Sequence, residues 1–218
     1  MSKIFLLIFL YGYAVTTSAQ PICRNDAVPS FNIDSLKNIY GKNKQLVTEY
    51  ELASLIALSY FPELNQQRVQ FKLNSINSTA RTTVTFFSLF RKMNKQFMIY
   101  INDDIQQTGM LLCQAPFDAQ VAAIAHELAH VVDFKNRNFL GMARWGSHYL
   151  FEKDISKIER DADKIVIEHG LGWKLYNWAY FILNHSDSDK RYLKMRKERY
   201  LLPNEIKEYI SKVHDSKP

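Results

Sequence analysis

The chain has 218 residues, of which 47% are hydrophobic and 23% are charged, a balance that suits one globular domain with one core. The formal net charge of +6 is mild, and Lys and Arg concentrate between Lys190 and Lys197. Neither a basic stripe with interleaved aromatic residues nor a phosphate-binding glycine loop is evident. We therefore interpret the cluster as a solvated helix face and expect no nucleic-acid partner.

The N-terminus resembles an export signal rather than part of the fold. Lys3 precedes the uncharged apolar run Ile4–Val15, and the small residues after it resemble a signal-peptidase site. The run is shorter than the roughly 20 residues that span a bilayer, and an uncleaved N-terminal anchor is the alternative. We predict a signal peptide over residues 1–19. The mature chain, residues 20–218, is expected to form a single exported domain, periplasmic or secreted, without a membrane span.

The sequence contains only two cysteines, Cys23 and Cys113, and both lie in the predicted mature part. In an oxidising compartment they could pair and tie the N-terminus to the segment before residue 117. The alternative is two free thiols. They do not have the C-x-x-C spacing of a zinc or redox site.

Two helices are expected ahead of any strand. The segment Ile33–Tyr40 is predicted to be a short helix that ends at Gly41. The segment Gln45–Tyr60 carries apolar residues at helical spacing and stops before Pro62, so a longer helix is expected there.

Three runs with the character of β-strands follow. Arg68–Leu73 and Gln96–Asn102 alternate in their side chains, and Thr79–Phe90 between them is rich in Thr, Val and Phe. Short polar stretches separate the runs, as turns would. The sequence therefore predicts a small antiparallel sheet that leads into the next helix.

That helix carries the most informative residues of the chain. Asp118 is a suitable N-cap, and helix-favouring Ala and Leu follow with no Gly or Pro before Gly141. His126 and His130 are i and i+4, so their imidazoles leave one face a turn apart, the spacing at which two His share a tetrahedral Zn²⁺. Glu127 is rotated by about a third of a turn, which suits a general base rather than a ligand.

A helix whose two His are only polar tips at the edge of the core is the alternative. Small and apolar residues surround the motif on both sides, however, so the helix is expected to be buried. Two His and one Glu inside a buried helix are costly without a partner, and a metal ion supplies one.

The rest of the chain is predicted to be helical. A loop-like stretch with two glycines covers residues 136–147. The expected helices after it are Lys153–Glu168, Trp173–Leu183, Asp187–Tyr200 and Pro203–Val213. The predicted fold class is therefore α+β, with a small antiparallel sheet, the motif helix and a helical C-terminal half.

A catalytic zinc needs a third protein ligand and an open position. The pattern H-E-x-x-H-x-x-G-x-x-H is ruled out, because Asp133 and Asn136 stand at its glycine and third histidine. Downstream, Glu159 and Asp163 are i and i+4 on a predicted helix. Glu159 can ligate zinc, and Asp163 can accept a hydrogen bond from the far ring nitrogen of a ligand His. A solvated acidic helix turn is the alternative.

These residues resemble the gluzincin metallopeptidases. His126-Glu127-x-x-His130, followed by Glu159-x-Asp161-Ala162-Asp163, is similar to the pattern H-E-x-x-H…E-x-[E/D]-A-D. The resemblance is to the HtpX and CAAX-prenyl-protease type, which includes soluble, exported minimal forms. It covers about residues 95–191, with Asp161 where Glu is commoner and without the usual membrane segments.

A third motif of that family is His-Pro-x-x-x-x-Arg. Here His185 and Arg191 keep its His-to-Arg spacing, with Ser186 in place of Pro. The resemblance implies that His185 or Arg191 lies near the substrate or the oxyanion, with His148 from the loop as a rival.

The resemblance also implies a zincin-like fold and the remaining roles. His126, His130 and Glu159 would bind Zn²⁺, Glu127 would act as the general base, and Asp163 would orient a ligand. The implied activity is a zinc-dependent endopeptidase that hydrolyses peptide bonds of extended or unfolded polypeptide. Such a substrate can bind by adding a strand to an exposed sheet edge.

Two other functions stay open at this point. The chain could be an exported zinc-containing binding or chaperone-like module with little turnover, or a metal-free structural domain. Zinc content separates the structural domain from the other two, and hydrolysis of unfolded protein separates an enzyme from a binding module.

Overall fold

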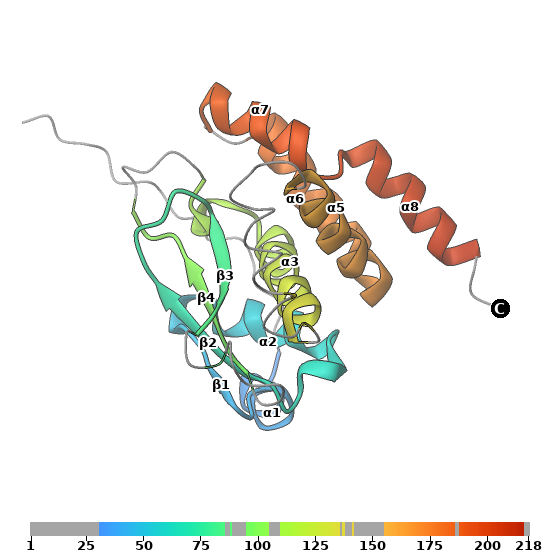
Figure 1. The fold of residues 1–218 in the computed structure, drawn as a ribbon. Coiled ribbons are helices and arrows are strands. Elements are labelled where there is room, and N and C mark those ends of the chain that lie inside the picture. The colour runs from blue at the N-terminus through green and yellow to red at the C-terminus, as the bar shows by residue number, and fades with distance from the viewer. Residues whose placement is uncertain are drawn as a thin grey trace, which may run out of the picture.

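The protein is an α+β fold in which a small mixed sheet lies against a mostly helical remainder (Figure 1). The computed structural model describes residues 31–85, 88, 95–104, 110–135, 137, 141, 155–185 and 188–215. The predicted signal peptide and most of the predicted loop 136–147 lie outside these ranges. The α+β class expected from the sequence is therefore confirmed.

The sheet has four strands in the order β1-β2-β4-β3. They are β1 Lys44–Gln45, β2 Arg68–Leu73, β3 Ala80–Val84 and β4 Gln96–Ile101. The expected fully antiparallel sheet is wrong, because β1–β2 and β2–β4 are parallel and only β3–β4 is antiparallel. The reason is burial: in β4, Phe97, Ile99 and Ile101 are fully buried, so this strand takes the centre. β3, which carries one Arg and two Thr in five residues, is left at the edge of the sheet that the described residues form.

The N-terminal helices differ in how well local signals predict them. Helix α1 spans Ile33–Tyr40 and ends at Gly41 as expected. The predicted helix Gln45–Tyr60 is wrong in its first part, since a strand and a 3₁₀ turn precede α2, Glu51–Ser59. The ammonium of Lys44 donates to three carbonyls of the segment before β2, and this holds β1 extended beside β2.

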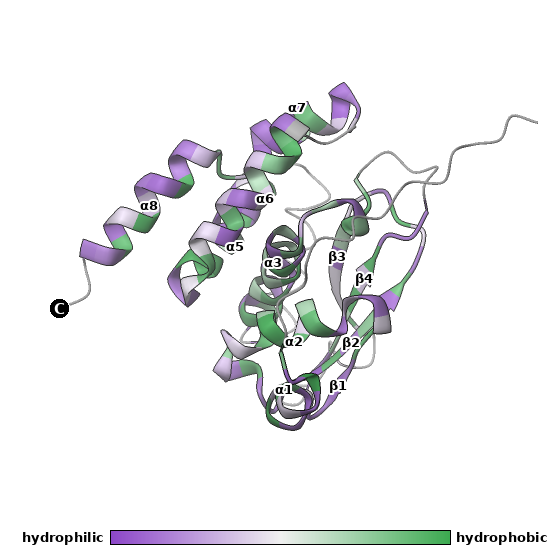
Figure 2. Ribbon diagram, turned by 180° about the vertical axis from the view of Figure 1, so that it is seen from behind, coloured by the Kyte–Doolittle hydropathy of each residue, from purple (hydrophilic) through white to green (hydrophobic). Residues whose placement is uncertain are grey.

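Helix α3, Phe117–Lys135, lies at the centre of the molecule, between the sheet and the C-terminal helices (Figure 1). It is predominantly hydrophobic (Figure 2) and almost wholly buried from Ala119 to Val131. Asp118 is not the expected N-cap, because the helix begins at Phe117, and the Asp118 carboxylate pairs with Lys174 instead.

A buried lysine closes the other end of α3. Lys95 is 2% exposed, and its ammonium donates to the carbonyls of Phe134 at 3.0 Å, Lys135 at 3.2 Å and Arg137. The last carbonyls of a helix have no partner within the helix and carry its negative dipole end. Lys95 therefore anchors the C-terminus of α3 to the sheet.

From Ile155 onward the described residues are mostly helical, as the sequence predicts. The helices are α5 Ile155–Val166, a π-helical turn Ile167–Leu171, α6 Gly172–His185, α7 Lys190–Arg199 and α8 Pro203–Asp215. Gly170, at a φ of 85°, makes the bend between α5 and α6, a backbone conformation that favours glycine. α5 and α6 pack on α3, and α8 packs on α6 (Figure 1).

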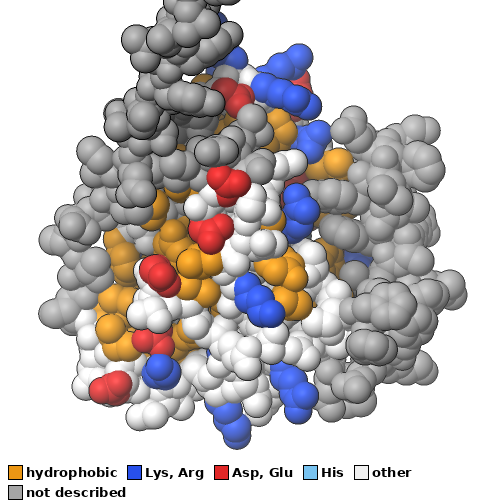
Figure 3. All heavy atoms as spheres, turned by 90° about the vertical axis from the view of Figure 1, so that its left-hand side faces the viewer, with side chains coloured by type: hydrophobic (Ala, Val, Ile, Leu, Met, Phe, Trp, Pro, Cys, Tyr) orange, Lys and Arg blue, Asp and Glu red, His pale blue; other side chains and the backbone are white. Residues whose placement is uncertain are grey.

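Two further features concern the surface of the molecule and Cys113. On the sheet side, hydrophobic side chains lie among charged side chains of both signs (Figure 3). Within the described ranges, no helix has both the length and the apolar character needed to cross a membrane. Cys113 takes part in a disulfide bond, and its predicted partner Cys23 lies outside the described residues.

Candidate metal centre

Two helices bring together three side chains of the kinds that ligate metal ions in proteins. His126 and His130 leave one face of α3, with ring centroids 4.8 Å apart, and Glu159 faces them from α5. One donor atom from each of the three lies within 4.8 Å of the others, and all three residues are buried. Helical spacing places the two imidazoles together, and α3–α5 packing adds the carboxylate. This group could bind a metal ion.

The distances suit a tetrahedral ion. Two ligand atoms about 2.0–2.1 Å from a tetrahedral zinc lie roughly 3.3–3.4 Å apart. His130 Nε2 and Glu159 Oε2 are 3.4 Å apart, and His126 Nε2 and Glu159 Oε2 are 2.9 Å apart. The first pair already has this spacing, and the second would need to open by a small amount. The donor atoms of the two imidazoles lie within 4.8 Å of each other.

Asp163 holds one of these imidazoles from behind. Its Oδ1 accepts a hydrogen bond from His126 Nδ1 at 2.9 Å, and its Oδ2 accepts one from the Leu201 backbone N–H at 2.9 Å. With Nδ1 occupied by Asp163, Nε2 of His126 is directed toward Glu159. A carboxylate behind a metal-binding His fixes its tautomer and raises its basicity.

The charges of this group support one another. Burial by itself lowers the pKa of His126, but hydrogen bonds to Asp163 and Glu159 and their charges raise it to about 10. Burial by itself raises the pKa of Glu159, but the charge of His130 and hydrogen bonds to both imidazoles hold it well below its usual range. The carboxylate of Glu159 is therefore negatively charged at neutral pH, beside the two imidazoles.

Glu127 stands beside this group without belonging to it. It is 7% exposed, and its Oε2 lies 2.7 Å from the hydroxyl of Thr82 on β3, which donates to it. The same hydroxyl is 2.9 Å from the Glu127 carbonyl oxygen. The strand therefore fixes the orientation of a buried carboxylate one residue away from His126.

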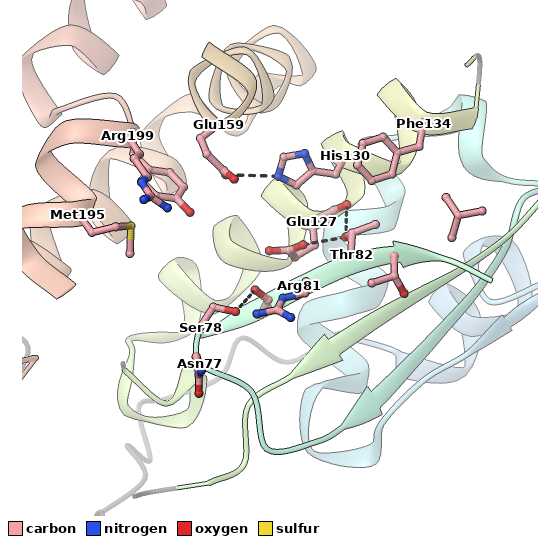
Figure 4. Close-up of a pocket in the computed structure, with 14 residues that line it drawn as sticks. Asn77, Ser78, Arg81, Thr82, Glu127, His130, Phe134, Glu159, Met195 and Arg199 are labelled. Carbon is pink, nitrogen blue, oxygen red and sulfur yellow. Dashed lines mark hydrogen bonds and ion pairs between the residues drawn. The ribbon is translucent and has the colours of Figure 1, made fainter. Parts of the chain in front are cut away.

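A cavity of about 460 Å³ opens onto Glu127, His130 and Glu159. Figure 4 shows Glu159 pointing toward His130 and Glu127 toward Thr82, with Met195 and Arg199 on the α7 side. The lining residues come from the segment before β3, from β3 itself, from α3 and α5, and from the end of α7. They are Asn77, Ser78, Ala80, Arg81, Thr82, Thr83, Val84, Glu127, His130, Phe134, Glu159, Met195, Arg199 and Tyr200.

Among the residues that the structure describes, β3 pairs with β4 alone, and residues of β3 line one side of the cavity. Asn102 N–H donates to the Thr79 carbonyl at 3.0 Å at one end of the β3–β4 ladder. Thr85 N–H donates to the Gln96 carbonyl at 3.0 Å at the other end. In an antiparallel pair such bonds recur at every second residue, so odd-numbered positions pair with β4. The backbone groups that face the open edge are those of Ala80, Thr82 and Val84.

Tyr200 is a cavity residue that the sequence did not single out. It follows the last residue of α7, and its ring centroid is 5.5 Å from that of His126. Burial raises its pKa well above the usual value, and the charges of Glu159 and Glu127 add to this. No motif spacing marks this position, because α5–α7 packing brings it to the site.

The other expected residues are placed differently. Arg191 is exposed in the first turn of α7 and is not one of the described residues that line the cavity. His185 is the last residue of α6, and its side chain lies outside what the structure describes. His148 also lies outside the described residues.

Among known proteins, no family model, curated sequence or solved structure matches this chain. Its membership of a family therefore stays a prediction from the motifs. The structure itself provides a buried group of two imidazoles and one carboxylate that could bind a metal ion, beside a second carboxylate and an open strand.

Proposed function

We propose that the chain is an exported zinc-dependent endopeptidase with a zincin-like fold, acting on extended or unfolded polypeptide. One observation carries the proposal. Two members of the buried candidate metal group, His130 and Glu159, border the same cavity as a second carboxylate and β3, which pairs on one side only among the described residues. A purely structural metal site needs neither the second carboxylate nor the open strand.

The donor set favours zinc. Two imidazole nitrogens and one carboxylate oxygen form a common set of ligands for catalytic zinc, which keeps a fourth position open. His126, His130 and Glu159 would hold the ion, and Asp163 would orient His126. When bound, zinc supplies a Lewis acid that polarises the substrate carbonyl and lowers the pKa of water.

Glu127 is the proposed general base. Its carboxylate lies next to the ligands without being one, and Thr82 fixes its direction. It takes a proton from the attacking water and then passes the proton to the leaving amine of the cleaved peptide. Because it is 7% exposed, bulk water competes little for it.

β3 is the proposed binding site for the substrate backbone. An extended peptide can add to an open strand edge through main-chain hydrogen bonds, which do not depend on its sequence. The backbone N–H and C=O of Thr82 point away from β4, and the Thr82 side chain donates a hydrogen bond to Glu127. A peptide that pairs with β3 at Thr82 therefore passes close to the proposed base. A folded substrate lacks a free extended segment, which favours unfolded chains.

Export is part of the same proposal. The apolar run after Lys3 suggested a signal peptide, and the disulfide bond of Cys113 supports an oxidising compartment. Disulfides persist outside the cytosol and are rare within it. The periplasm or the extracellular space fits both features.

The test compares hydrolysis of unfolded casein by the zinc-loaded wild-type chain, the Glu127→Gln variant and a surface control, Glu208→Gln. Glu127→Gln should retain zinc and lose about 10²- to 10⁴-fold in rate, while the exposed Glu208 change should have no effect. If the wild type binds zinc but is no faster than Glu127→Gln, hydrolysis is excluded. The alternative, a zinc-containing binding or chaperone-like module with little turnover, then takes its place.

A further inference from the structure

We infer that Tyr200 is the hydrogen-bond donor that stabilises the oxyanion in this reaction, an assignment that rests on the proposed peptidase function. Attack on a peptide carbonyl places negative charge on its oxygen, and fixed donors aimed at that oxygen lower the barrier. The sequence led us to expect His148, His185 or Arg191 in this role. The cavity instead offers Tyr200 beside the metal-binding group.

The position of Tyr200 is fixed from its backbone. Its carbonyl accepts a hydrogen bond from Arg160 Nη1 at 3.1 Å, and Arg160 is the residue after Glu159. The next N–H along the chain, that of Leu201, donates to Asp163 at 2.9 Å. Both anchors are on α5, the helix that supplies the third metal-binding side chain, so the tyrosine and Glu159 are held in one frame.

The ring of Tyr200 has two close neighbours. The guanidinium of Arg196 lies 3.5 Å from the centroid of the ring, and the imidazole of His126 lies 5.5 Å from it. A cation over the face of an aromatic ring and a ring packed at its side leave little freedom of rotation. Pre-organisation of this kind is what a stabilising donor needs, because it then costs no reordering during the reaction.

The hydroxyl itself is available. Within the described ranges, the phenol oxygen of Tyr200 has no hydrogen-bond partner, and this oxygen is not fully buried. Tyr200 is also one of the residues that line the cavity. By contrast, the hydroxyls of two other C-terminal tyrosines are engaged, that of Tyr192 with Thr79 and that of Tyr209 with Glu168.

The step is simple to write. The phenol keeps its proton and donates a hydrogen bond to the carbonyl oxygen as that oxygen becomes negative, and no bond of Tyr200 forms or breaks. A phenol is an O–H donor at neutral pH, because its ordinary pKa is about 10. The interaction strengthens with the charge, so it acts on the transition state more than on substrate binding.

The test compares Tyr200→Phe with Tyr209→Phe, which removes a hydroxyl far from the cavity. We measure kcat and KM on a peptide that spans a cleavage site of casein. We also measure the zinc content of each variant and its affinity for a phosphinic peptide of the same sequence. Removing one oxyanion donor should lower kcat by about 10²- to 10³-fold. KM and zinc content should stay near wild type, while the phosphinic peptide should bind more weakly by a similar factor.

Several outcomes would overturn the inference. They are a kcat within threefold of wild type, a loss carried by KM, a loss of zinc, or unchanged binding of the phosphinic peptide. A wild-type chain that cleaves no faster than Glu127→Gln removes the peptidase function and this inference together. A wild type that cleaves well, with a Tyr200→Phe variant that cleaves equally well, removes the inference alone.

Discussion

Replacing Asp163 by Asn should weaken metal binding and destabilise the metal-free protein at the same time. Asp163 is 1% exposed, and its two oxygens accept from His126 Nδ1 and from the Leu201 N–H, each at 2.9 Å. Asn keeps the shape but has only one oxygen. Its amide NH₂ must face one of the two donors, which leaves that donor buried without an acceptor.

The size of both effects follows from those contacts. An orphaned buried donor costs about 1–3 kcal/mol, and breaking a buried charge pair with His126 costs about 3–5 kcal/mol. The free energy of unfolding of the metal-free chain should therefore fall by about 3–5 kcal/mol. Loss of the carboxylate behind a ligand His should lower zinc affinity about 10- to 100-fold.

Asp161→Asn is the matched control on the same helix. Its carboxylate is 48% exposed and pairs with Lys164 at 2.9 Å, an arrangement worth about 0–1 kcal/mol. Chelator competition gives zinc affinity, and urea unfolding of the stripped protein gives stability. The reasoning is refuted if Asp163→Asn binds zinc within threefold of Asp161→Asn and unfolds at the same urea concentration.

Three further predictions concern α3, the proton balance and export. Lys95→Met should lower the free energy of unfolding by about 2–4 kcal/mol, because several carbonyls at the end of α3 lose their donor. The control Lys72→Met, at an exposed position, should lower it by less than about 0.5 kcal/mol, and equal urea midpoints for the two variants would contradict this. Burial lowers the pKa of His126 but its carboxylate partners raise it to about 10, so zinc must displace about one proton at neutral pH. Zinc affinity should then rise with pH, and calorimetry in two buffers that shows no proton release would count against it. The purified exported chain should begin at or near Gln20, and mass spectrometry that finds intact Met1 on cytosolic material would overturn the export proposal.

Local signals predicted the elements that local forces determine. The glycine after Tyr40 and the alternation in Arg68–Leu73 were enough to give the bounds of α1 and β2. Spacing alone predicted that His126 and His130 share one helix face. The i, i+4 spacing of Glu159 and Asp163 likewise predicted that both lie on one helix, which is α5.

Features that depend on packing between distant segments were not predictable in the same way. β4 lies between β2 and β3 because its alternate side chains are the most deeply buried, which no local pattern of β2 or β3 reveals. Tyr200 reaches the cavity only because Arg160 and Asp163 bind the backbone at the end of α7. The residues before Tyr200 in the sequence are mostly basic and indicate only the end of a solvated helix.

A crystal structure of the zinc-loaded chain, with anomalous data collected at the zinc edge, tests the central claim most directly. We predict one strong peak within about 2.0–2.2 Å of His126 Nε2, His130 Nε2 and a Glu159 oxygen, with Glu127 outside that distance. A peak elsewhere, no peak between α3 and α5, or an ion held by the two imidazoles with Glu159 turned away would contradict it.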